Sequence, residues 1–305
     1  MMRRLFIALI ALVASVLTAN SGLLLINGGG AGPPYVFQGI GDLGLSSVTN
    51  YWGFRCYSTS YTGIVADIWD STTGSTTETQ LTCSSGGVIN QTVNALSVTC
   101  ASGCNVKTLY NQVANSTSAV SNMTQATNAN RPTFLSSGCG YSGGNATYQY
   151  CMQGTTATVQ YLTTGTITSI TQIFDFNIVG KTTEHTANQF ALSAISGAHI
   201  QWGTSSGTIA VTFGTQITLT GATESVWHTI FGEGNGSSSY AQYDTTSSGA
   251  VAGGSDATGT KLALCASTAG ATPCTAFIAE AFLTSAANEA SWGAIQSNQN
   301  TYWGL

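Results

Sequence analysis

Residues 198–231 read AHIQWGTSSGTIAVTFGTQITLTGATESVWHTIF, and this stretch indicates the class of fold. Short runs of β-branched and aromatic residues alternate in it with Gly, Ser and Thr. Such runs favour strands, and the small polar residues between them mark turns. The runs predicted as strands are Ala198–Trp202, Ile209–Phe213 and Val226–Phe231.

The same pattern extends over the rest of the chain. Many short strands with little helix favour two packed antiparallel sheets. We therefore predict an all-β fold, an antiparallel two-sheet jelly-roll sandwich of concanavalin A-like type with a short C-terminal helix. The further runs that predict strands are Gly63–Trp69, Ile167–Ile178, Lys261–Ala266 and Ala276–Leu283.

Helix signals are confined to two places. Asn90 is placed to cap a helix that carries Val93 and Leu96 on one face. Ser285 is placed to cap a helix at the C-terminus. One stripe of this second helix would consist of Trp292, Ile295, Gln299 and Tyr302.

The composition is unusual for its low charge. Only 6% of the 305 residues are charged, whereas about 25% is usual. Ser, Thr, Asn and Gly supply the polar surface instead. Nucleic-acid binding requires clustered cations that neutralise phosphates, and the cations beyond the N-terminus are isolated, so we expect no nucleic-acid partner. These cations are Arg55, Lys107, Arg131, Lys181 and Lys261.

The N-terminus has the pattern of an export signal. Arg3 and Arg4 precede the apolar run Leu5–Ala19. Polar residues then interrupt the run before it reaches the roughly 20 residues of a transmembrane helix. Apolar residues resume at Leu23–Ile26, so an uncleaved membrane anchor is one alternative, and it is the one membrane contact we consider. A buried strand of the domain is the other alternative. We expect a secreted or extracytoplasmic protein with a signal peptide at 1–19, a linker at 20–34 and one domain at 35–305.

The eight cysteines fall into neighbouring pairs, and export makes disulfides their expected state. Eight cysteines allow 105 pairings, and we predict that nearest neighbours pair. No Cys-x-x-Cys motif occurs and the histidines are scattered, so we expect no metal site and no cofactor. The predicted pairs are Cys56–Cys83, Cys100–Cys104, Cys139–Cys151 and Cys265–Cys274.

Two segments carry a family resemblance. The first, Trp52–Pro132, resembles the catalytic domain of α-L-arabinofuranosidase B of glycoside hydrolase family 54 in the order of its motifs. The family has Asp where this chain has Asn111, and a Gly after the position of Gln112 that is missing here. The motifs are Trp52–Tyr57, Tyr61–Ile68, Cys100–Cys104, Val106–Gln112, Met123–Thr127 and Arg131–Pro132.

The second segment, Trp227–Leu305, is similar to the closing half of a laminin-G-like or concanavalin A-like jelly roll. It contains a strand from Trp227, the hairpin strand Tyr240–Asp244 and the ending Tyr302–Leu305. The two resemblances together imply the jelly-roll fold that the strand pattern already predicts.

The resemblance also implies where hydrolytic acids would stand. Retaining glycosidases need two carboxyl groups about 5–5.5 Å apart. The family places its nucleophile after two adjacent cysteines, which this chain lacks; the nearest counterpart is Phe174–Asn177 leading to Glu184. Its acid/base position falls near Ala263–Ser267, which holds no carboxylate.

Two acids remain weak catalytic candidates. Glu184 stands beside His185 and would form an acid/base pair, or it is a solvated turn residue. Glu280 lies between apolar strand neighbours, which favours a buried structural acid bonded to the backbone or to an arginine. We consider an enzyme less favoured than a binding protein.

A tyrosine-rich loop is the predicted ligand-binding surface. Sugars stack on aromatic rings and bond amides, and binding residues concentrate on loops held by a rigid scaffold. Packing of these rings within the sandwich is the alternative, and we expect Trp52, Trp69, Trp202, Trp227 and Trp292 in the core. The predicted binding residues are Tyr141, Asn145, Tyr148, Gln149 and Tyr150.

These observations favour a secreted, non-catalytic module that binds a carbohydrate or mediates surface interactions. The expected partner is a glycan or cell-surface polysaccharide. The alternatives are an α-L-arabinofuranosidase-like hydrolase and a structural appendage protein of a phage tail or cell surface.

Overall fold

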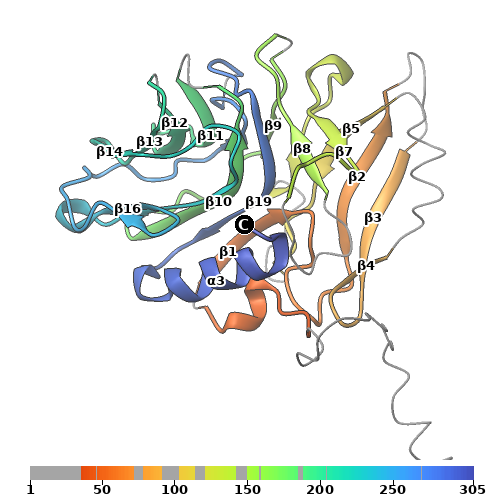
Figure 1. Cartoon of the computed structure of the whole chain (residues 1–305), viewed down its shortest axis with the longest axis horizontal. Coiled ribbons are helices and arrows are strands. Elements are labelled where there is room, and N and C mark those ends of the chain that lie inside the picture. The colour runs from red at the N-terminus through yellow and green to blue at the C-terminus, as the bar shows by residue number, and fades with distance from the viewer. Residues whose placement is uncertain are drawn as a thin grey trace, which may run out of the picture. The chain divides into compact units, whose positions relative to one another are not determined.

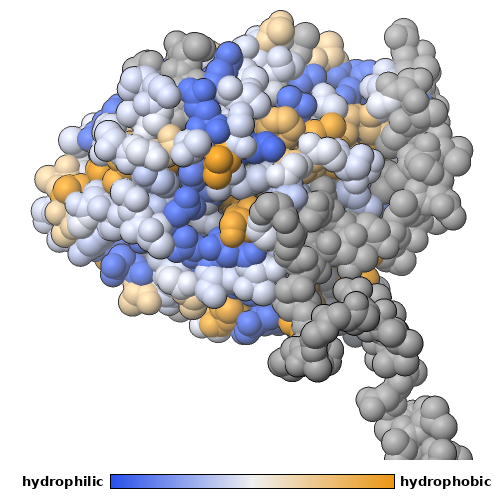
Figure 2. Space-filling model, viewed as in Figure 1, coloured by the Kyte–Doolittle hydropathy of each residue, from blue (hydrophilic) through white to orange (hydrophobic). Residues whose placement is uncertain are grey.

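The computed structural model describes residues 36–45, 47–71, 78–90, 103–113, 121–141, 150–157, 159–184, 188–203, 205–268 and 270–305. Residues Phe37–Leu305 form one compact unit. No helix among the described residues combines the length and apolar character needed to cross a membrane. The face drawn in Figure 2 is mostly pale to blue with scattered orange patches, as expected for a surface of small polar residues.

One antiparallel sheet is built around the longest strands, β10 and β19 (Figure 1). All nine residues of β10 are buried, because the strand is covered on both faces. The strands of this first sheet, in spatial order, are β1 (Val48–Gly53), β19 (Ala276–Thr284), β10 (Phe174–Thr182), β15 (His228–Gly234), β16 (Tyr240–Tyr243) and β17 (Thr246–Ser247).

A second antiparallel run of strands faces the first. Its strands, in spatial order, are β4 (Val88–Asn90), β3 (Glu78–Ser84), β2 (Ile64–Asp70), β5 (Cys104–Leu109), β6 (Met123–Thr124), β9 (Leu162–Thr163), β18 (Leu262–Leu264), β11 (Gln189–Ala194), β12 (His199–Trp202), β13 (Thr208–Thr212) and β14 (Gln216–Thr220). Two strands, β7 (Thr133–Leu135) and β8 (Cys151–Gln153), connect β5 to β19.

The main core lies between the two sheets. Phe174 and Phe176 of β10 pack against Phe213, which follows β13. The layers approach closely at Gly232 of β15, where a Cβ atom would collide with Val211. Hydrophobic burial of this kind is the main stabilising contribution to the fold.

A C-terminal helix, α3 (Trp292–Trp303), covers the outer face of the first sheet. Trp292 stacks on Phe231 of β15 with ring centroids 5.0 Å apart, and Ile295 joins the same apolar cluster with Tyr51 and Phe282. The helix ends at Gly304, whose φ of 73° is the left-handed conformation that favours glycine. Short 3₁₀ turns occur at η1 (Ile40–Leu43), η3 (Asn128–Asn130), η4 (Gly236–Ser238) and η5 (Glu289–Ser291).

The predicted all-β jelly-roll sandwich with a short C-terminal helix is confirmed, but several boundaries are wrong. Helix α3 begins at Trp292, because β19 continues to Thr284 and η5 intervenes. The strand predicted from Ile167 begins only at Phe174, because the backbone N–H of Ile167 bonds to a loop carbonyl, that of Thr260. The helix predicted after Asn90 falls at 91–102, outside the described residues.

Three of the predicted disulfides are confirmed. Cys56–Cys83, Cys139–Cys151 and Cys265–Cys274 have Cα atoms 5.9, 6.1 and 4.8 Å apart. Cys104 is also disulfide-bonded, while its predicted partner, Cys100, lies outside the described residues. The bridges constrain the unfolded chain and thereby stabilise the fold.

Candidate functional site

The end of β10 brings together Glu184 and several hydroxyl and amide groups. The Thr182 hydroxyl lies 2.7 Å from the Glu184 carbonyl oxygen, to which it donates, and 3.2 Å from the Glu184 backbone N. The Glu184 carboxylate accepts a hydrogen bond of 3.1 Å from the hydroxyl of Thr275, which directly precedes β19. Local contacts therefore hold this carboxylate at the sheet end, where it is partly exposed.

Gln189, at the start of β11, positions the backbone around Glu184. Its amide N–H donates to the Glu184 carbonyl at 3.0 Å, and its carbonyl oxygen accepts from the Thr275 backbone N–H at 2.8 Å. This amide is almost fully buried. Both its N–H group and its carbonyl oxygen have hydrogen-bond partners, as buried polar groups require.

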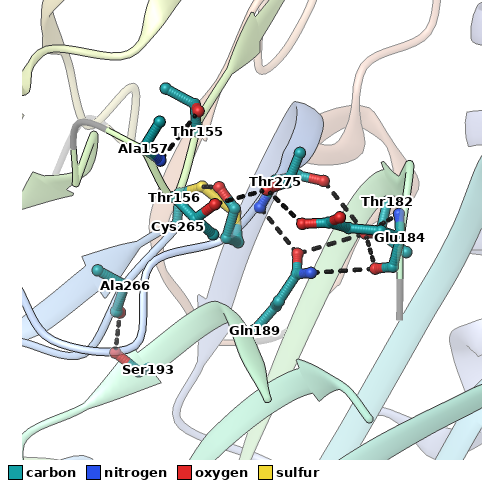
Figure 3. Close-up of a disulfide and its surroundings, with 11 residues drawn as sticks. Thr155, Thr156, Ala157, Thr182, Glu184, Gln189, Ser193, Cys265, Ala266 and Thr275 are labelled. Atoms are coloured by element: carbon teal, nitrogen blue, oxygen red, sulfur yellow. Dashed lines mark hydrogen bonds between the residues drawn. A yellow bond between two sulfur atoms is a disulfide. The ribbon is translucent and has the colours of Figure 1, made fainter. Parts of the chain in front are cut away.

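The Cys265–Cys274 disulfide lies beside this cluster. Figure 3 shows Thr275 between the disulfide and Glu184, with Thr155 and Thr156 on the other side. Gly154 packs so closely on this disulfide that a Cβ atom there would collide with the Cys265 sulfur. The Thr156 hydroxyl lies 3.4 Å from that of Thr275 and is exposed.

The second catalytic candidate, Glu280 on β19, lies apart from this cluster and inside the protein. Arg55 binds both of its carboxylate oxygens, with Nε–Oε2 and Nη2–Oε1 distances of 2.5 and 2.9 Å. Both side chains are fully buried. A carboxylate so enclosed has no contact with solvent through which a substrate would reach it.

Further donors complete the shell around Glu280. The Tyr51 hydroxyl, the Gln299 amide and the Trp303 indole N–H donate to it at 2.8, 2.6 and 3.2 Å. Burial by itself lowers the pKa of Arg55, but Glu280 and Tyr51 outweigh it, so that pKa is raised. The geometry is therefore that of a permanent ion pair beneath α3.

The tyrosine-rich loop starts beside Lys181 of β10, three residues before Glu184 in the sequence. The Cys139 carbonyl accepts hydrogen bonds from Lys181 Nζ on β10 at 2.6 Å and from the Trp227 indole at 3.0 Å. Tyr141 stacks between Trp227 and Trp303, with centroids 4.5 and 5.0 Å away. Tyr150 is buried against Phe134. The described rings of the loop therefore pack inward; Asn145, Tyr148 and Gln149 lie outside the described residues.

The tryptophan predictions are correct for four residues and wrong for one. Trp52, Trp202, Trp227 and Trp292 are buried, whereas Trp69 is only partly buried. Trp69 lies on the outer face of β2, where two cations contact its ring. Lys107 Nζ and Arg131 Cζ lie 5.0 and 4.8 Å from the ring centroid.

Sequence reasoning missed three buried titratable groups. Asp175 and Glu233 face each other on β10 and β15, and His228 bonds Asp244 at 2.6 Å. Strand register alone brings these groups together, and no spacing in the sequence reveals it. Among the described residues, no group of three or more His, Cys, Asp or Glu side chains is placed to hold a metal ion.

Comparison with known proteins places the fold. No family model matches the sequence, and no curated protein matches it. Solved structures do match: an arabinofuranosidase complexed with arabinofuranosyl-α-1,2-xylobiose has a TM-score of 0.53 at 14% identity over 83% of this chain. A mutant of a glycoside hydrolase family 54 α-L-arabinofuranosidase soaked with 4-nitrophenyl α-L-arabinofuranoside has a TM-score of 0.56 at 13% identity over 84%.

This chain covers 62% of each of those chains. At such low identity the likeness concerns the fold, and the fold is a jelly roll of the concanavalin-like kind. Within that class the fold is similar to that of the family 54 arabinofuranosidase, which confirms the jelly-roll fold that the sequence resemblance implies.

Proposed function

We propose that this chain is an exported, non-catalytic module that binds carbohydrate through the Glu184 cluster and the adjoining Cys139–Cys151 loop. Three disulfides are typical of an extracellular protein. The fold is one that carbohydrate-active proteins use. The expected partner is a glycan.

The observation that carries this proposal is the chemistry of the Glu184 cluster. A partly exposed carboxylate stands beside the Thr275 and Thr156 hydroxyls. Sugar hydroxyls both donate and accept hydrogen bonds, so this set matches them. The Cys265–Cys274 disulfide directly precedes Thr275 and helps to fix these groups in advance, which reduces the entropy lost on binding.

The same cluster favours binding over hydrolysis. Glycosidases of either stereochemistry use two carboxyl groups. The hydrogen-bond partners of Glu184 are hydroxyl and amide groups, and Glu280 is fully engaged by Arg55. Among the described residues, neither acid has a second carboxyl group as a hydrogen-bond partner, whereas a glycosidase needs such a pair.

A glycan array with the exported chain tests the proposal. Glu184→Gln and Tyr148→Ala should each weaken binding roughly tenfold, equivalent to about 1.4 kcal/mol per variant. Glu78 is an acid at the start of β3, opposite Trp69 of β2. Glu78→Gln is therefore the matched control and should leave binding unchanged. Equal binding by all variants would place the ligand elsewhere on the molecule.

The arabinofuranosidase alternative rests on the fold likeness. It predicts release of nitrophenol from 4-nitrophenyl α-L-arabinofuranoside that Glu184→Gln abolishes. We expect no release above background from either form. Failure of both binding and hydrolysis, with ordered polymers in the electron microscope, would instead favour a structural appendage.

A further inference from the structure

Two acids are buried opposite each other in the first sheet. Asp175 on β10 pairs directly with Glu233 on β15 in the antiparallel register. The two residues are only 1% and 2% exposed. Side chains directly opposite in such a pair have Cβ atoms about 4.5–5.5 Å apart, so the two carboxyl groups are immediate neighbours.

Each carboxyl group has one oxygen with a donor and one without. Asp175 Oδ2 accepts from the Asn288 backbone N–H at 2.9 Å. Glu233 Oε1 accepts from the Asn235 amide at 3.2 Å. The remaining oxygens, Asp175 Oδ1 and Glu233 Oε2, are buried without a hydrogen-bond donor.

Two ionised carboxylates at this separation would repel each other where no solvent screens them, and two oxygens would lack donors. One proton removes both problems. It neutralises one acid and supplies the missing donor between the two unpaired oxygens.

We propose that Asp175 and Glu233 share one proton, and that this carboxyl–carboxylate bond is a pH-sensitive latch holding the start of the C-terminal helix to the sheet. The latch is attached to the helix by Asn288, which precedes η5 and α3. Trp292, the first residue of α3, covers β15 on the same side.

The surrounding groups favour the protonated form. Burial, followed by the negative charge of Glu233, raises the pKa of Asp175 to about 8, while hydrogen bonds from Asn288 and Trp292 work in the opposite direction. Burial also raises the pKa of Glu233 against hydrogen bonds from Asn235 and the Glu289 backbone. The negative charge of the Glu289 carboxylate on η5 raises the pKa of Glu233 further. From β19, the neutral Thr284 hydroxyl contacts the Asp175 backbone N–H at 3.2 Å.

The sign of the pH effect follows from these pKa directions. An acid whose pKa is raised in the folded state keeps a proton that the unfolded chain has released above about pH 4. The folded state therefore loses stability as the pH rises from about 4 towards about 8, the pKa of Asp175 in the folded state. Above that value the latch loses its proton.

Amide substitutions provide a sharp test. In Asp175→Asn the new N–H₂ group donates to Glu233, and in Glu233→Gln it donates to Asp175. Each single variant thus mimics the shared proton permanently. In the double variant Asn288 and Asn235 hold the carbonyl oxygen of each new amide, so the two N–H₂ groups face each other and neither has an acceptor.

We expect the wild-type melting temperature to fall more steeply between pH 5 and pH 9 than that of either single variant, whose remaining fall comes from other titrating groups such as His228. The double variant should melt at least about 5 °C lower than either single variant at every pH. A double variant as stable as the singles would overturn the proposal, because simple charge removal predicts that result. Glu224→Gln, a partly exposed acid, is the matched control and should follow the wild type.

Infrared spectroscopy of the wild type gives a second test that requires no variant to fold. A protonated carboxyl group should be visible at pH 7 and disappear by pH 10. Both single amide variants should lack that band at pH 7. Absence of the band in the wild type at pH 7 would refute the shared proton.

Discussion

Two regions under the same helix bury carboxylates in different ways. Glu280 on β19 is neutralised by Arg55, an opposite charge that donates to both of its oxygens. No cation pairs with Asp175 or Glu233 in the part of the chain that the structure describes, and we assign them a shared proton. In a chain with only 6% charged residues, cations are scarce, so burying an acid requires either a reserved arginine or a retained proton. The second solution makes stability depend on pH, because the shared proton is lost as the pH rises.

The largest effect is expected from removing the arginine of the first region. Arg55→Met leaves Glu280 buried without its countercharge, although Tyr51, Gln299 and Trp303 still donate to it. Breaking a buried ion pair from one side costs about 3–5 kcal/mol. Urea unfolding of the variant should show a loss of that size.

The double variant Arg55→Met with Glu280→Gln is the control for this loss. It removes both charges and keeps a side-chain oxygen that accepts from Tyr51, Gln299 and Trp303, so it should recover much of the stability. A double variant no better than Arg55→Met would mean that packing of the arginine, rather than the unpaired charge, accounts for the loss.

The second effect concerns how Arg55 is held in place. Its neighbour Cys56 is bridged to Cys83, at the end of β3, across a separation of 27 residues. No disulfide cysteine neighbours Asp175 or Glu233 in sequence. Replacing both Cys56 and Cys83 by Ala should reduce the free energy of unfolding by about 2–4 kcal/mol.

Combining this change with Arg55→Met sharpens the comparison. If the bridge positions the arginine, the two losses should be less than additive in urea unfolding, because the second change removes an interaction already weakened. Strict additivity would show that the disulfide acts on the unfolded chain alone.

These features differ in how well the sequence alone predicts them. The fold class follows from local signals, since runs such as Ala276–Leu283 alternate with turn residues. The pairing of Cys265 with Cys274 was predictable because only a short loop separates them. The opposition of Asp175 and Glu233 was not, because it depends on the register between β10 and β15, which are 53 residues apart at Asn177 and Ile230. The site at Glu184 was named as a single residue, but its Thr275 and Gln189 partners come from other strands.

A third, smaller effect concerns the protonation of His228. Both ring nitrogens of His228 face acceptors: Nδ1 lies 2.6 Å from the Asp244 carboxylate and Nε2 3.0 Å from the Thr223 carbonyl. Both contacts are hydrogen bonds only when both ring nitrogens carry a proton, so the site favours the imidazolium form. Burial opposes this charge, but Asp244 outweighs it and the pKa of His228 is raised.

Because the folded pKa is raised, the stabilisation is complete below the unfolded value of about 6.5 and is lost as the pH rises through the folded pKa. His228→Gln should therefore destabilise by about 1–2 kcal/mol at pH 5.5, and the difference from wild type should shrink by pH 9. Unfolding in urea at both pH values measures it. A difference that does not change with pH would show that His228 acts through packing instead.

The smallest effect is expected at the exposed pair of Lys107 and Glu78. Their charged atoms lie 2.6 Å apart, but the side chains are 34% and 28% exposed. Solvent and salt screen such a pair, so Lys107→Ala should cost about 0–1 kcal/mol, including its contact with the Trp69 ring. A double-mutant cycle with Glu78→Gln at low and high salt isolates the ion-pair contribution, which should vanish at high salt. If that coupling instead matched the loss in Arg55→Met and resisted salt, exposure would not govern the strength of ion pairs in this fold, and the contrast between the regions beneath α3 would need another physical cause.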